Sequence, residues 1–231
     1  MRQLRQHQRL LVIGSVGERL MSYDLTKLLV IGISSQALFD LDFEDKIYRS
    51  HGLQPFIDYQ RAHESEMLQP GPAFPLIQGL LRVNELTGDK KIEVVLMSRN
   101  HPDVCLRVFN SIEGHKLEIS RAALTGGASV GPYLSAYNVG LFLSASKADV
   151  QEAANKGFAA GLIYPSPSNL TSDIFPIKIA FDGDRVLFSD EAQRIYDEHG
   201  PNAFFEHERR KAQSALPDGP FANLLRTLRK L

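Results

Sequence analysis

The chain has 231 residues, of which 43% are hydrophobic and 23% are charged, as in a folded domain with a buried core. The formal net charge is −1, so bulk electrostatics do not favour nucleic acid as a partner. The single cysteine, Cys105, excludes an intramolecular disulfide and a multi-cysteine metal site. No apolar run is long enough to cross a bilayer, and no clear cleavage site follows the apolar stretch at 10–16. We therefore expect a cytoplasmic protein without a membrane partner.

Short, continuous apolar runs have the pattern of buried strands that are covered on both faces. In chain order they lie at 28–33, 93–97, 139–143, 159–164 and 177–181. Helical patterns lie between and after them, at 41–63, 76–86, after Pro102, at 132–137, at 149–156 and beyond 190. Strands that alternate with helices predict an α/β fold with a mostly parallel sheet.

The segment 176–190, PIKIAFDGDRVLFSD, places two acids directly after the last predicted strand. Because residues two apart in an extended segment point to the same side, Asp182 and Asp184 would aim at one spot. A β-hairpin with an Asp-Gly turn is the alternative for these residues, although the alternation of strands and helices weakens it. Functional sites in parallel sheets lie beyond the carboxyl ends of the strands. The residues at these ends are Ser34, Ser98, Ser144 and Asp182.

The sequence contains an internal repeat, from about 28–83 (the first copy) to about 176–231 (the second copy). A shift of 148 residues pairs identical residues, among them Ile31 with Ile179, Tyr48 with Tyr196, Gly52 with Gly200, Gly71 with Gly219 and Leu80 with Leu228. In this register Ser34 and Gln36 fall on Asp182 and Asp184, so the chemistry is expected in the second copy. We predict a poorly ordered extension at 1–24, followed by one domain at 25–231.

Carboxylates at strand ends suit the hydrolysis of phosphate monoesters. One carboxylate can attack phosphorus as a covalent nucleophile, and a second can protonate the leaving alkoxide and then activate water. A divalent cation offsets the negative charge of the substrate and the nucleophile, and hydroxyl and cationic groups hold the phosphoryl group. The predicted strand ends supply groups of these kinds.

These motifs resemble those of the haloacid dehalogenase superfamily of phosphatases. The first motif of that family matches Asp182-Gly183-Asp184, the second matches the strand that ends at Ser98, and the fourth matches 141–161 with Asp149 as its acid. Ala145 stands where the fourth motif usually has its first acid, and the motif order is that of a circular permutation. The resemblance implies a Rossmann-like sheet with helices on both faces and helical cap-like inserts.

More narrowly, the chain resembles the cytosolic type I 5'-nucleotidases and their bacterial relatives. The segments that carry this resemblance are ISSQALFDL (33–41), LQPGPAFPL (68–76), VLMSRNHPDV (95–104), LTGGAS (124–129) and IAFDGDRVLFSDEA (179–192). The resemblance implies Mg²⁺-dependent hydrolysis of nucleoside 5'-monophosphates through an aspartyl-phosphate intermediate.

The resemblance also implies roles for the acids. Asp182 would be the nucleophile and a metal ligand, and Asp184 would be the general acid and base, with its main-chain carbonyl on the metal. Asp149 would complete the protein's share of the Mg²⁺ site, which suits an ion that prefers oxygen ligands and keeps several waters. Taken alone, Asp149 is also an ordinary residue for capping a helix.

The predicted phosphate-binding groups are Ser98, Asn100 and Arg121, although Arg121 alone fits a solvated surface cation equally well. The expected partner is a nucleoside monophosphate, with a homo-oligomer left open. Two alternatives are a phosphatase of another small phosphomonoester and a non-catalytic nucleotide-binding module.

Overall fold

The computed structural model describes residues 23–165 and 176–230, so the predicted extension at 1–24 lies almost entirely outside the described residues. Five strands form one sheet in the order β3-β2-β1-β4-β5, and every pairing is parallel. The strands are β1 (Leu29–Ile33), β2 (Ile92–Ser98), β3 (Arg121–Leu124), β4 (Leu141–Ser144) and β5 (Ala160–Leu162). This arrangement confirms the predicted α/β fold with a parallel sheet.

The sequence of β1 explains its central place. All five of its residues are buried, and Ile31 pairs with Val94 of β2 on one side and with Leu141 of β4 on the other. A strand without an outward-facing polar residue is stable only where both its faces and both its edges are covered.

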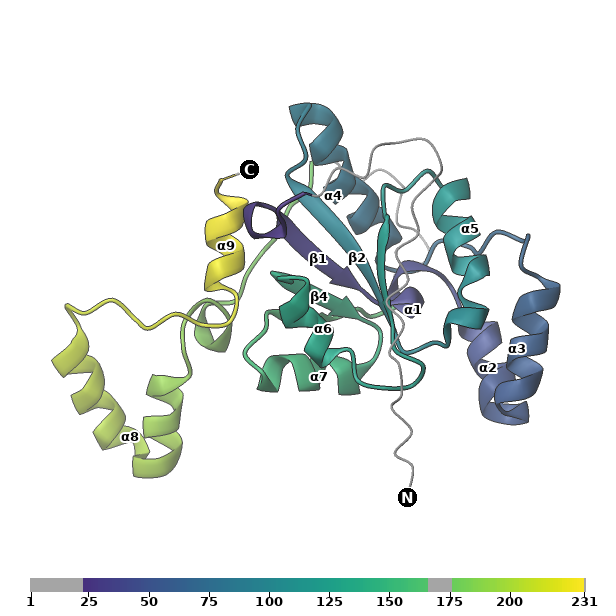
Figure 1. The fold of residues 1–231 in the computed structure, drawn as a ribbon. Coiled ribbons are helices and arrows are strands. Elements are labelled where there is room, and N and C mark those ends of the chain that lie inside the picture. Colours follow the sequence, from purple (N-terminus) through teal and green to yellow (C-terminus); the bar gives the residue numbers. More distant parts are fainter. Residues whose placement is uncertain (1–22, 166–175, 231) are drawn as a thin grey trace, which may run out of the picture.

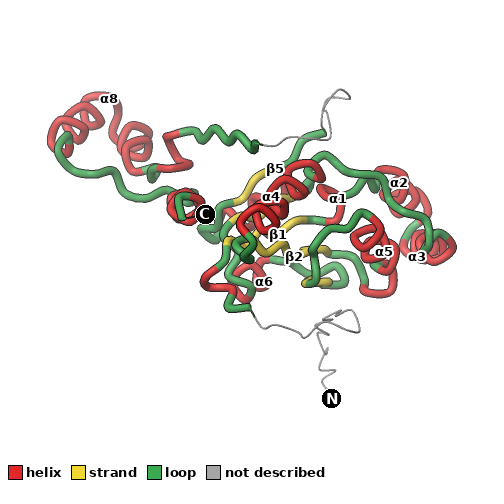
Figure 2. Tube along the Cα trace, turned by 90° about the horizontal axis from the view of Figure 1, so that it is seen from above, coloured by secondary structure: helices red, strands yellow, loops and turns green. Residues whose placement is uncertain are grey.

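Helices cover both faces of the sheet (Figure 1). They are α1 (Ser35–Leu38), α2 (Asp42–His51), α3 (Leu53–Ala62), α4 (Phe74–Thr87), α5 (Leu106–Gly114), α6 (Gly131–Ala136), α7 (Lys147–Asn155), α8 (Glu191–Lys211) and α9 (Ala222–Leu228). Apolar residues of α4, α5 and α9 join the core on one face, and those of α6 and α7 join the core on the other. Figure 2 shows that α8 and the α2–α3 pair project on opposite sides of the sheet. None of the helices described here is both long and apolar enough to cross a membrane.

The prediction of a strand at 177–181 is wrong. These residues have no regular secondary structure, and the remaining strand of the sheet is β3, which the sequence shows only as short apolar pieces around Arg121. The hairpin alternative is wrong too, because Gly183–Leu187 forms a π-helical turn, η3. The two positions beside β1 are taken by β2 and β4, so the second copy has no place at the centre of this sheet. Ile177 and Phe181 instead pack against the core on one face of it.

The two copies nevertheless make matching backbone contacts. Gly52 between α2 and α3 has φ +83°, and Gly200 within α8 has φ +80°, so a left-handed glycine bends the helical segment of each copy. Equivalent hydrogen bonds run from Gly71 N–H to the Leu38 carbonyl (2.9 Å), from Gly219 N–H to Leu187 (2.8 Å), from Ala73 N–H to Ala37 (2.9 Å) and from Phe221 N–H to Val186 (3.0 Å). Equivalent donors in the two copies are 148 residues apart, whereas equivalent acceptors are 149 residues apart. The π-helical turn of the second copy therefore holds one residue more than the matching segment of the first copy.

Candidate functional site

Serine hydroxyls form a polar surface at the carboxyl edge of the sheet. Ser34 follows β1, and its Oγ accepts hydrogen bonds from the backbone N–H groups of Ala37 (3.2 Å) and Ala145 (3.3 Å). Ser98 ends β2, is buried, and has its Oγ 3.2 Å from the Oγ of Ser35. These contacts join the ends of β1, β2 and β4 into one surface, as the strand-end rule predicts.

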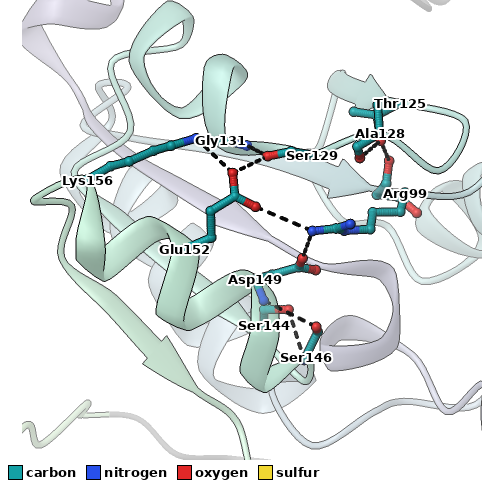
Figure 3. Close-up of polar contacts among 11 residues, drawn as sticks. Arg99, Thr125, Ala128, Ser129, Gly131, Ser144, Ser146, Asp149, Glu152 and Lys156 are labelled. Atoms are coloured by element: carbon teal, nitrogen blue, oxygen red, sulfur yellow. Dashed lines mark hydrogen bonds and ion pairs between the residues drawn. The ribbon is translucent and has the colours of Figure 1, made fainter.

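An ionic cluster lies over this edge (Figure 3). The Arg99 guanidinium contacts Asp149 Oδ1 in a short ion pair and lies 3.5 Å from Glu152 Oε2. Glu152 Oε1 accepts from Lys156 Nζ at 2.7 Å and from the Ser129 hydroxyl. Both hydrogen bonds lower the pKa of Glu152 below its usual value, and the bond from Lys156 has the larger effect. The cluster ties α7 to the loop after β2.

Asp149 therefore has a protein cation as its partner. Its side chain is only 9% exposed, and the Arg99 guanidinium already compensates its charge. Its backbone N–H donates to Ser146 Oγ at 3.3 Å, so Ser146, and not Asp149, caps α7. A metal ion at this carboxylate would compete with Arg99.

Asp182 and Asp184 lie in a different part of the molecule. Both are exposed, and both have extended backbone, with ψ +152° and +132°, at the start of η3. Asp182 borders a cavity of about 830 Å³ whose other lining residues are mostly aliphatic. Across the described parts of the chain, no contact joins either acid to Asp149, and no group of three His, Cys, Asp or Glu residues is placed to hold a metal. The convergence of Asp182, Asp184 and Asp149 stays a prediction.

Of the three predicted metal ligands, Asp182 and Asp184 suit a magnesium ion better than Asp149 does. Asp182 offers the oxygens of an exposed carboxylate and Asp184 its main-chain carbonyl oxygen, and both are the hard donors that Mg²⁺ prefers. Asp149 does not fit in this arrangement, because Arg99 holds its Oδ1. Asp182 and Asp184 are the residues that would hold the ion.

Arg121 lies away from the carboxyl edge. It is the first residue of β3, and its Nε is 3.4 Å from Oε1 of Glu93, a carboxylate only 1% exposed on β2. Lys90 Nζ lies 2.7 Å from the other oxygen of Glu93. The two cations compensate a buried charge, which accounts for Arg121 without a phosphate. The arginine at the carboxyl edge is Arg99.

The glycine-containing segment at 124–129 holds the loop that follows Ser98. The backbone N–H groups of Thr125, Gly126 and Gly127 donate to the carbonyls of Ser98, Asn100 and Arg99, respectively. Gly126 and Gly127 have φ of +59° and +94°, a conformation that favours glycine. These N–H groups are thus used within the protein, and the turn orders Asn100 instead of cradling a phosphate.

Sequence reasoning missed Glu152 and Lys156, which join the ionic cluster that Arg99 makes with Asp149. Glu152 is three residues after Asp149, and Lys156 is four residues after Glu152. Residues at these spacings share one face of a helix, which is the signal that could have found them.

Cys105 lies just after this edge but is an unsuitable nucleophile. Its side chain is fully buried, and burial raises the pKa of the thiol to about 12. We expect iodoacetamide at pH 8 to leave the native protein unlabelled and to label the urea-unfolded protein at one position, as measured by intact mass. Rapid labelling of the native chain would contradict this burial.

Two comparisons with known proteins address the family. The family model described as 5'-nucleotidase matches residues 21–231. The chain is also 36% identical over 209 residues to cytosolic 5'-nucleotidase 1B of Homo sapiens, an alignment that covers 88% of this chain and 34% of that relative. The chain thus spans about a third of the length of this curated relative. No solved structure matches the chain. The chain belongs to the 5'-nucleotidase family.

Proposed function

We propose that this protein hydrolyses nucleoside 5'-monophosphates to nucleoside and phosphate, with Mg²⁺ as cofactor and Asp182 as nucleophile. The observation that carries the proposal is the exposed Asp182-Gly183-Asp184 turn, which the second copy has and the first copy lacks. Family membership supports the reaction class. The extended backbone at both acids leaves their carboxylates accessible to a phosphate group.

In the proposed reaction, the Asp182 carboxylate attacks phosphorus, and the bond from phosphorus to the nucleoside 5'-oxygen breaks. Asp184 gives its proton to the leaving oxygen. It then takes a proton from the water that hydrolyses the aspartyl-phosphate and restores Asp182. A magnesium ion held by Asp182 and the Asp184 carbonyl would offset the charge of the phosphate.

Three of the remaining predicted groups, Ser98, Asn100 and Asp149, lie at the carboxyl edge of the sheet. Ser98 and Asn100 stay in the proposal as phosphate ligands, and Asp149 joins the metal ligands where Arg99 releases it. The pairing of Arg121 with Glu93 argues against its predicted role. We further propose a cytoplasmic location for the protein.

The test is phosphate release from a panel of nucleoside 5'-monophosphates and sugar phosphates. We expect release from the nucleotides, at least about 100-fold lower in EDTA because the metal supplies several kcal/mol of charge stabilisation. Excess Mg²⁺ should restore the rate. A preference for sugar phosphates would favour the alternative function, a phosphatase of another small phosphomonoester.

A second candidate, a nucleotide-binding module without turnover, is favoured by the Arg99–Asp149 ion pair. This pair places a protein cation at the carboxyl edge of the sheet. Saturable nucleotide binding by calorimetry, with no phosphate released in Mg²⁺, would support this candidate over the enzyme.

A further inference from the structure

The hydroxyl of Ser34 has a proton to donate at the carboxyl edge of the sheet. Its Oγ accepts hydrogen bonds from the backbone N–H groups of Ala37 (3.2 Å) and Ala145 (3.3 Å). The contacts among the described residues include no acceptor for the hydroxyl proton of Ser34 itself. Since Ser34 is only partly buried, this donor is available to a ligand.

A second hydroxyl proton is left over between Ser35 and Ser98. Their Oγ atoms lie 3.2 Å apart, so one hydroxyl donates to the other and one of the two protons is used. Ser98 Oγ also accepts from the backbone N–H of Asn100 at 3.1 Å. Both serines are 4% exposed, so few waters reach the remaining proton, and a ligand oxygen would satisfy it.

The guanidinium of Arg99 adds charged donors to the same edge (Figure 3). Its ion pairs with the described carboxylates of Asp149 and Glu152 are both made by Nη2. A guanidinium carries its N–H donors in a planar fork, so these contacts leave the donors on Nε and Nη1 for another partner. The Arg99 side chain is 41% exposed, which lets a ligand reach them.

The loop after β2 and the helix α7 fix the position of this arginine. The carbonyl of Arg99 accepts from the backbone N–H of Gly127 at 2.6 Å, and the α7 carboxylates hold its guanidinium. The two cations of the cluster, Arg99 and Lys156, balance its two carboxylates. The cluster therefore has no net charge with which to repel an anion.

The hydroxyls and the arginine meet beside the start of α7. Ser34, which follows β1, accepts from the N–H of Ala145. Arg99, which follows β2, pairs with Asp149, four residues further along the chain. Because β1 and β2 are neighbours in the sheet and both contact this short segment, their donors lie within one small region.

The repeat explains how this edge can bind an anion without a metal ion. Ser34 and Gln36 occupy the positions of the first copy that correspond to Asp182 and Asp184 of the second. Two carboxylates beside a phosphate group need a divalent cation to offset the negative charge, whereas a hydroxyl and an amide do not. The first copy thus has neutral groups at the positions of the two acids.

We propose that this edge is a metal-independent site for the phosphate group of a phosphomonoester, with donors from Ser34, the Ser35–Ser98 pair and Arg99. Asp149 and Glu152 are positioning residues that act through Arg99. A phosphate group has several acceptor oxygens, which suit a planar guanidinium fork and two hydroxyl donors. This inference rests on the proposed function only for the choice of phosphate as the anion, and not on the chemistry of Asp182.

Calorimetric titration of the full chain with inorganic phosphate in EDTA tests the site. We expect saturable binding, which Arg99→Ala weakens by about tenfold or more because it removes charge-assisted hydrogen bonds. Arg99→Lys keeps the charge but lacks the planar fork, so its binding should be about threefold weaker or more. Arg49→Ala removes an exposed, ion-paired arginine from α2 and should bind phosphate like the unmodified chain. Circular dichroism checks that the variants are folded.

Asp149→Asn separates positioning from simple electrostatics. Removal of a negative charge beside the site would strengthen phosphate binding if Asp149 did not orient Arg99. We expect instead about threefold weaker binding, since a guanidinium without its partner is less well oriented. The measurement in EDTA makes this result independent of any role of Asp149 as a metal ligand.

Absence of saturable binding in EDTA, or unchanged binding by Arg99→Ala and Arg99→Lys, would overturn the site. Stronger binding by Asp149→Asn would overturn its positioning role. Phosphate release in Mg²⁺ is measured separately, so the two proposals fail in different ways. A chain that binds phosphate through Arg99 in EDTA but releases none from nucleotides would refute the hydrolysis and support this site.

Discussion

Asp182→Asn should reduce phosphate release from nucleoside monophosphates by more than about 10⁴-fold, the scale of loss when a covalent nucleophile is removed. The amide has no negative charge with which to attack phosphorus, and it is a weaker ligand for Mg²⁺. Because Asp182 is exposed and caps no helix through its side chain, the substitution should leave folding unchanged. Steady-state phosphate release, with thermal unfolding measured in parallel, checks both expectations.

Asp190→Asn is the matched control for this variant. Asp190 lies eight residues later, is exposed, and makes an ion pair with Arg194 at 3.3 Å. We expect its rate to stay within about twofold of the unmodified protein, since exposed pairs contribute little. The rate of phosphate release by Asp184→Asn should lie between those of these two variants, with a loss of about 10²- to 10⁴-fold for a missing general acid and base. Substantial turnover by Asp182→Asn would exclude Asp182 as the nucleophile.

The strands that sequence reasoning located are those with unbroken apolar runs. β1 is apolar throughout and β2 is apolar from Val94 to Met97, and both strands are buried at every position, so these apolar runs identify them. β3 escaped because it begins with Arg121, whose charge is compensated by Glu93 on the neighbouring strand. A contact between residues 28 positions apart leaves no local signal in the sequence.

The error at 177–181 has a related cause. The segment has the same apolar character as β1 and the same place in the repeat, but strand formation also needs neighbouring strands. β2 and β4 supply them to β1 and not to the second copy. Sequence pattern therefore identified a segment suited to a sheet, while the availability of partners decided whether a strand formed.

In the candidate site, too, the sequence predicted the residues at strand ends but not the contacts that depend on tertiary packing. The strand-end rule placed Ser34, Ser98 and Ser144 at one edge, because the carboxyl ends of parallel strands meet there. It could not predict that Arg99 turns toward Asp149, since that contact joins the loop after β2 to α7 through side-chain geometry. Nor could it place Asp182, whose position depends on how the second copy packs.

Arg107→Ala should lower the free energy of unfolding by about 3–5 kcal/mol, the usual effect of leaving a buried charge without its partner. Arg107 Nη1 donates to Glu44 Oε1 at 2.6 Å, and both residues are buried. Its Nε donates to the carbonyl of Glu66 at 2.9 Å, so one side chain joins α5 to α2 and to the segment after α3. Urea unfolding followed by circular dichroism measures the change.

Arg49→Ala is the control, because Arg49 makes an ion pair with Asp45 at 2.7 Å on the same α2 but is 76% exposed. Its expected cost is about 0–1 kcal/mol. The double variant Arg107→Ala with Glu44→Gln should recover part of the loss, since it removes the unpaired charge. Equal costs for Arg107→Ala and Arg49→Ala would mean that water reaches Glu44, and that the α2–α3 pair is held by apolar contacts alone.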